Sequence, residues 1–140
     1  MHNTINADVL IYHFNDAAVP PPDHRSYTIR LTSTNINLSV DSYGEILHEE
    51  EFSVSNELLN LANQLVSNKK IRNCDLLEED TISGSTSESL TLFSANDIVF
   101  KGSIYHAGKQ GVGNLCGDVG ELTNQLKKNF LYFKKENNQV

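Results

Sequence analysis

The glycine-rich stretch near the end of the chain comes closest to the spacing of a known chemical site. Gly108, Gly111 and Gly113 flank Lys109, and Asp118 follows at the start of a predicted helix. A strand, glycines and a helix in that order let backbone N–H groups and the helix N-terminus hold an anion. The stretch lacks the Gly-Lys-Ser/Thr ending of a P-loop, and too little chain follows for a dinucleotide-binding fold. Lys109, Gly111, Gly113 and Asp118 are therefore candidates for a small-ligand site, and a flexible strand-to-helix connection is the simpler interpretation.

A ligand site in this region would lie between the Gly108–Gly117 loop and a second long loop at residues 74–88. His106, Lys109 and Asp118 would converge on it. Such a site would be recognised in the structure as a concave pocket in which titratable groups contact one another. A small-ligand-binding protein or an enzyme with its site at the Gly108–Gly117 loop is thus the alternative function.

Metal and nucleophile chemistry find little support in the spacing of the residues that could perform them. The possible metal ligands lie far apart in the sequence, unlike those of a zinc site. They are His13, His24, His48, His106, Cys74 and Cys116. The acidic run Glu49–Glu51 is typical of a solvated face, and Ser85 and Ser87 do not form a Gly-x-Ser-x-Gly turn. We therefore expect no catalytic residues, no cofactor and no metal.

A third group combines polar and aromatic residues near predicted strand ends. It consists of His24, Arg25, Asp41, Tyr43, Tyr105 and His106. Arg and Tyr are enriched at interfaces because they give planar donors or amphipathic area at low entropic cost. We take these six residues as partner-binding candidates. Ordinary structural contacts, such as an Arg25–Asp41 ion pair, are the alternative.

The charge balance bears on the kind of partner. The chain of 140 residues carries 18 acidic and 11 basic side chains, a net charge of −7. This charge opposes a phosphate backbone, so we expect no nucleic-acid partner, and it favours a basic protein partner. Modest negative charge that only maintains solubility is the simpler reading.

Cellular location is inferred from hydrophobicity and cysteines. No window approaches the roughly 20 apolar residues of a membrane span, and Met1–Thr4 does not begin a secretion signal. We expect a cytoplasmic protein with no membrane partner. Cys74 and Cys116 are predicted to be reduced thiols, although a bridge between them stays open.

The elements that must position these residues follow from hydrophobic periodicity. Period-two alternation or short apolar runs predict six strands. They cover residues 9–14, 26–32, 36–41, 45–52, 90–93 and 98–106. Three-and-four spacing predicts a helix from a Ser55 N-cap through Val66 and another from an Asp118 N-cap through Phe133.

These elements predict a single α+β domain over residues 1–140 with a frayed tail at 136–140. The fold class is one mostly antiparallel sheet in β-βββ-α-ββ-α order, with two helices packed on one face. The other face, which carries Thr28, Arg30, Asn37 and Ser39, is left to solvent or a partner.

Four strings of the sequence resemble a family of small bacterial proteins with no assigned activity. They are His24-Arg25-Ser26-Tyr27-Thr28-Ile29, Asp41-Ser42-Tyr43-Gly44, Ser87-Glu88-Ser89-Leu90, and Gly113-Asn114-Leu115 followed by Gly117-Asp118. The resemblance extends from about Tyr12 to Phe130. It implies a bacterial α+β domain and assigns no catalytic residue.

The expected function is a non-catalytic protein-binding module in a bacterial cytosol, of the immunity, inhibitor or adaptor type. Such a role needs a shaped surface and complementary charge, which an acidic domain without catalytic motifs can provide.

Overall fold

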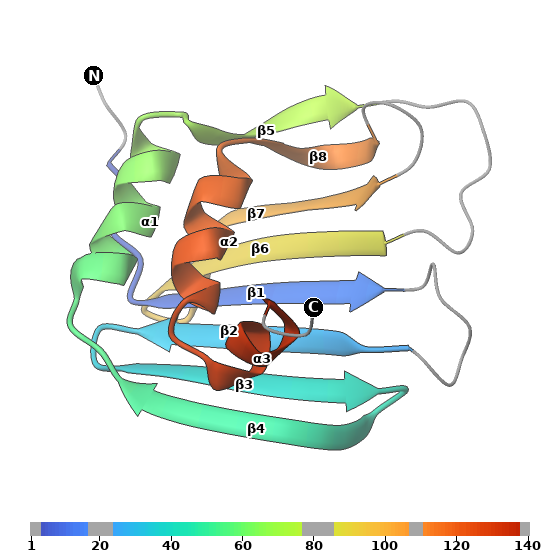
Figure 1. Cartoon of the computed structure of the whole chain (residues 1–140). Helices are drawn as coiled ribbons and strands as arrows, with labels where there is room; N and C mark the ends of the chain where they lie inside the picture. The colour runs from blue at the N-terminus through green and yellow to red at the C-terminus, as the bar shows by residue number, and fades with distance from the viewer. Residues whose placement is uncertain (1–3, 17–23, 77–85, 107–110, 138–140) are drawn as a thin grey trace.

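The computed structural model describes residues 4–16, 24–76, 86–106 and 111–137. Within these ranges, eight strands and three helices follow one another along the chain (Figure 1). The elements are β1 (Val9–Asp16), β2 (Ser26–Thr32), β3 (Asn35–Ser42), β4 (Glu45–Ser53), α1 (Glu57–Ser67), β5 (Ile71–Leu76), β6 (Thr86–Ser94), β7 (Asp97–His106), β8 (Val112–Gly117), α2 (Val119–Lys127) and α3 (Leu131–Asn137).

All eight strands form one antiparallel sheet in the order β4-β3-β2-β1-β6-β7-β8-β5. β1, the first strand of the chain, lies inside the sheet and pairs with β2 and β6. β4, which carries the charge run Glu49–Glu51, is an edge strand, and charged side chains are typical of such exposed edges. The predicted α+β class with a single sheet is correct, but the element order differs in detail.

The three helices cover the same face of the sheet (Figure 1). α1 carries the chain from β4 at one edge to β5 at the other, and it buries Leu59, Ala62, Leu65 and Val66. The side-chain amide of the buried Asn63 bonds to both backbone groups of Ala7. Oδ1 accepts from the Ala7 N–H at 2.8 Å, and Nδ2 donates to the Ala7 carbonyl at 3.1 Å. These bonds fix the segment that leads into β1.

The core lies between this sheet face and the helices. Period-two alternation places every second residue of the central strands there, including Leu10, Tyr12, Ile29, Leu31, Ile36, Leu38, Leu90 and Leu92. The helices contribute Leu122, Leu126 and Phe130 from α2 and the turn that follows it. The opposite face carries Thr28, Arg30, Asn37 and Ser39, which line a hollow of about 450 Å³ with the acidic side chains of β4.

Two of the eight described strands, β5 and β8, were not predicted from the sequence. The segment after residue 73 was expected to be a loop, but β5 occupies its beginning; β8 occupies the end of the glycine-rich loop. The two strands pair with each other, and a Cα–Cα separation of 6.0 Å allows a disulfide between Cys74 and Cys116. The expectation of reduced thiols is therefore wrong.

The helix ends also differ from expectation. Asn56 rather than Ser55 is the N-cap of α1. Asp118 is the N-cap of α2, as predicted, but its side chain makes no capping bond. One final helix was predicted, but two are present. α2 ends at Lys127, residues 128–130 are not helical, and α3 begins at Leu131.

Candidate functional site

Four of the six partner-binding candidates come together where β1 and β3 end and β2 begins. We call His24, Arg25, Asp41 and Tyr43 the His24 cluster. His24 is buried at 5% exposure, stacks on the Tyr43 ring with centroids 4.1 Å apart, and accepts at its carbonyl a 2.6 Å bond from Arg25 Nη1. The structure thus brings together four of the six residues that the sequence singled out.

Asp41 does not need Arg25 to stabilise its charge. Its two carboxylate oxygens accept from the Ser26 hydroxyl at 2.6 Å and from the Gly44 backbone N–H at 3.0 Å. Burial alone would raise the pKa of Asp41, but these bonds, with His13 and His24 nearby, hold that pKa below its ordinary value. The carboxylate orders the turn between β3 and β4.

His24 also lies between Ser42 and Asn15, in the order of a nucleophile, a base and an orienting amide. Nδ1 is 3.5 Å from Ser42 Oγ, and Nε2 is 2.7 Å from Asn15 Oδ1. The serine distance exceeds the reach of about 3.2 Å that proton transfer requires. The nearby N–H of Gly44 is bonded to Asp41, so it is not directed at a developing oxyanion. These contacts hold the turn in place.

Tyr105 and His106 lie apart from the His24 cluster, on β7, with β1 and β6 between them and β2. Tyr105 is exposed. His106 Nε2 lies 3.1 Å from Glu88 Oε2 of the neighbouring strand. The six candidates therefore form two groups at the same end of the sheet.

His106, but not Tyr105, lines a hollow of about 450 Å³ between α2 and the helix-covered face of the sheet. We call it the Glu88 pocket. Its lining includes Tyr12, Phe14, Glu88, Ile104, His106 and Lys127. Burial, followed by the charge of Glu88, raises the pKa of the Tyr12 phenol, which also hydrogen-bonds to Glu88. A titratable cluster in contact inside a concave surface is the mark expected of a ligand site.

The glycine-rich candidates that the structure describes, Gly111, Gly113 and Asp118, do not line this pocket. Lys109 lies outside the described residues. Gly111 and Gly113 have positive φ values of 79° and 148°, and side chains there would collide with the backbone of β7. Both glycines are needed for the close approach of β7 and β8, which is a structural reason for them.

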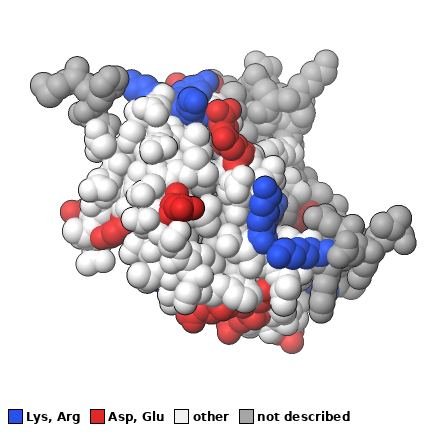
Figure 2. Space-filling view, turned by 60° about the vertical axis from the view of Figure 1, so that its left-hand side comes forward, with Lys and Arg blue, Asp and Glu red and all other residues white. Residues whose placement is uncertain are grey.

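Sequence reasoning missed an apolar surface at the β4 edge. Seven large apolar side chains are exposed among the described residues, and five lie on or beside β4. They are Tyr43 (69% exposed), Ile46 (54%), Leu47 (45%), Phe52 (39%) and Leu131 (57%). We call this set, with Glu45, Glu49 and Glu51, the β4 surface. Figure 2 shows acidic side chains along the lower border of the molecule, where β4 lies in Figure 1.

A bulge explains the exposure of Leu47. The pairing passes from Val40–His48 to Asp41–Ile46, so Leu47 is an extra residue without a partner on β3. This irregularity interrupts the alternation that sequence analysis relies on.

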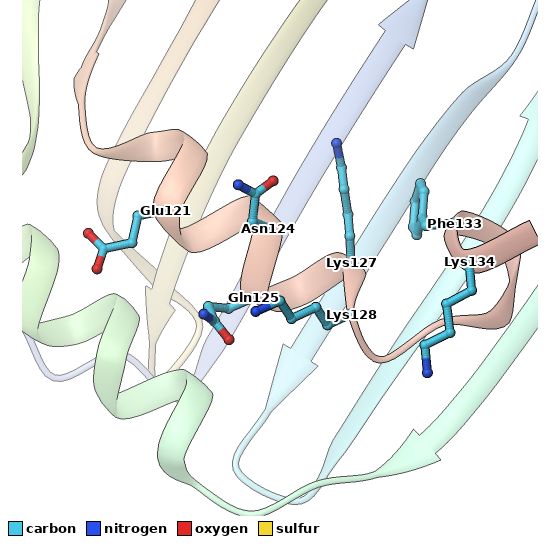
Figure 3. A pocket seen from close by; sticks show the side chains of 7 residues that line it. All are labelled: Glu121, Asn124, Gln125, Lys127, Lys128, Phe133 and Lys134. Carbon is cyan, nitrogen blue, oxygen red and sulfur yellow. The ribbon is translucent and has the colours of Figure 1, made fainter. Parts of the chain in front are cut away.

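A third surface is basic. Lys127, Lys128 and Lys134 line a hollow of about 580 Å³ on the outer side of α2 and α3. Figure 3 shows the three side chains pointing away from one another, so they do not surround one point. Lys127 lies over the rings of Tyr27 and Phe133, at 5.7 and 5.6 Å from their centroids.

Comparisons with protein-family models, curated proteins and solved structures give no match. Within the described part of the chain, no three His, Cys, Asp or Glu residues are grouped so that they could hold a metal ion. No described helix is long and apolar enough to cross a membrane.

Proposed function

We propose that this protein is a non-catalytic protein-binding module of the immunity, inhibitor or adaptor type, and that it binds a basic partner through the β4 surface. The observation that carries the proposal is the concentration of exposed apolar side chains beside carboxylates on one edge strand. Exposed apolar side chains that gather at one place mark interaction sites more often than those scattered singly over a surface.

The apolar members supply contact area of the kind that interfaces use. Tyr43 and Phe52 are aromatic, and Ile46 and Leu47 lie between them along the chain. Aromatic side chains are enriched at the centres of interfaces because they bury a large area at small entropic cost.

The carboxylates set the charge of the partner. Glu45, Glu49 and Glu51 are exposed along the same strand, and complementary charge accelerates encounter and excludes like-charged proteins. They also disfavour a second copy of this chain. In the fully overlapping antiparallel pairing of two β4 strands, Glu49 would lie opposite Glu49, and like charges opposite each other are destabilising.

The His24 cluster supports the same surface. The bonds that Asp41 accepts from Ser26 and Gly44, together with the stacking of His24 on Tyr43, fix the turn from which β4 begins. A preorganised turn lowers the ordering cost of binding at Tyr43.

The bacterial cytosol stays our proposal for the location, but the Cys74–Cys116 disulfide argues against it, because such bonds are rare in that compartment. The interface does not depend on this point, since neither cysteine belongs to the β4 surface.

Affinity capture from the native cell, read by mass spectrometry, tests the proposal with matched variants. Ile46→Asp changes the β4 surface, and Ile98→Asp changes an isoleucine of similar exposure, 56%, at the start of β7. We expect one partner in constant stoichiometry that Ile46→Asp loses and Ile98→Asp keeps. Failure to recover a partner, or equal capture by both variants, would count against the proposal.

A further inference from the structure

The Glu88 pocket has the size and setting of a small-molecule site. Its volume of about 450 Å³ lies within the usual range for ligand pockets. It lies between the sheet and one side of α2, where Gly120, Thr123 and Lys127 recur at helical spacing. The β4 surface lies at one edge of the sheet, whereas the pocket is lined by β1, β6, β7, β8 and α2. Protein binding at the β4 surface therefore does not explain the pocket.

A carboxylate at the wall of this pocket is chemically selective. Glu88 lies in the sheet between Phe14 and Ile104, and its side chain is only 17% exposed. Tyr12 and His106 hydrogen-bond to it, which positions the carboxylate in mainly apolar surroundings. Carboxylate oxygens can accept further bonds, and a charge-assisted bond from an ammonium group is strong where water is partly excluded.

Lys127 gives the pocket a charge of opposite sign. It belongs to the last turn of α2, and the rings of Tyr27 and Phe133 hold its ammonium group in place. A ligand with a carboxylate can bind there, whereas a simple cation is repelled by Lys127 and a simple anion by Glu88.

The rest of the lining favours an apolar body between these two charges. Phe14, Ile104, Leu115 and Val119 line the pocket between β1, β7, β8 and α2. Burial of a ligand's hydrocarbon against them is favourable in proportion to its area.

We propose that the Glu88 pocket binds a small zwitterion, an amino acid with an apolar side chain. Its ammonium group binds Glu88, its carboxylate binds Lys127, and its side chain packs on Phe14, Ile104 and Val119. This proposal is independent of protein binding through the β4 surface, and either can fail alone.

Three probes of the same carbon skeleton separate the contributions: L-leucine, isoamylamine, which lacks the carboxylate, and 4-methylpentanoate, which lacks the ammonium group. Titrations followed by amide NMR signals give each dissociation constant. We expect L-leucine to bind saturably near residues 86–90 and 119–127, and each analogue to bind about tenfold or more weakly. No saturable binding of L-leucine, or equal binding of either analogue, would overturn the proposal.

Variants with controls on the same helix test the two charges. Glu88→Gln and Lys127→Met should each weaken L-leucine about tenfold. Glu121→Gln and Lys128→Met change exposed residues of α2 and its C-cap, outside the pocket, and should leave binding within about twofold of the wild type. Melting curves verify that each variant is folded. If Glu88→Gln unfolds, Lys127→Met, at a surface position, still tests the pocket. Wild-type affinity in a folded Glu88→Gln or Lys127→Met variant would refute the assigned contacts.

Discussion

The carboxylate of Glu50 on β4 accepts a 2.8 Å hydrogen bond from the backbone N–H of Leu131, which begins α3. Its other oxygen accepts from the Tyr132 N–H at 2.9 Å and lies 2.7 Å from His48 Nε2. A negative charge at a helix N-terminus is stabilising, and here it joins residues 81 positions apart. Glu50 therefore ties α3 to the edge strand that we propose as the interface.

Replacing Glu50 should loosen this connection. Glu50→Gln removes the charge and one of the two acceptors, so we expect the free energy of unfolding to fall by about 1–2 kcal/mol. Urea denaturation measures the change. Glu49→Gln, at an exposed neighbour, is the control and should stay within about 0.5 kcal/mol of the wild type. Equal effects of the two substitutions would contradict the role of Glu50.

Stability should fall in acid through two carboxyl groups. Burial raises the pKa values of Asp41 and Glu50, but hydrogen bonds outweigh it and hold both below their ordinary values of 3.8 and 4.5. The unfolded chain then binds protons more readily, so each contribution is complete above the unfolded pKa and is lost as pH falls through the folded pKa.

Urea midpoints from pH 7 downward measure this dependence. We expect the midpoint to drop below about pH 5, and to drop less in an Asp41→Asn, Glu50→Gln double variant. An acid transition of unchanged size in the double variant would show that other groups cause it.

The Cys74–Cys116 bond should stabilise the β5 edge. It joins residues 42 positions apart, for which loop entropy gives about 4 kcal/mol. We expect dithiothreitol to lower the free energy of unfolding of the wild type by an amount of that order. A Cys74→Ser, Cys116→Ser variant should match the reduced protein and ignore the reagent; a wild type unaffected by reduction would contradict the prediction.

Gly117 should be sensitive to substitution because its φ is +103° and a side chain would meet the Lys70 carbonyl. Gly117→Ala is expected to cost more than about 2 kcal/mol in urea denaturation. Gly120 has open space around its Cβ position and lies in α2, so Gly120→Ala should stabilise by up to about 1 kcal/mol. Similar costs at both positions would argue against the close approach of β5 and β8.

The sequence predicts elements well where one periodic pattern covers them. Tyr27, Ile29 and Leu31 alternate with polar residues in β2, and Ile36, Leu38 and Val40 do so in β3; all six are buried. β5 has no such pattern, since Arg72, Asn73 and Asp75 are exposed. Its pairing depends on β8, a disulfide and glycines, which are interactions between distant segments.

The candidate sites also differ in how far local sequence patterns predict them. The His24 cluster could be predicted because its members lie next to strand ends that are close in sequence. The Glu88 pocket needs the register that pairs Glu88 with Ile104, together with the position of α2, neither of which local patterns encode. The apolar part of the β4 surface depends on the bulge at Leu47, which breaks the alternation.

Hydrogen–deuterium exchange of the chain alone and in complex with its captured partner tests the proposed interface most directly. The account predicts that amides of residues 43–53 and 131–132 become protected in the complex, while those of β5 and β8 at the opposite edge keep their exchange rates. Protection confined to residues outside the β4 surface would contradict it.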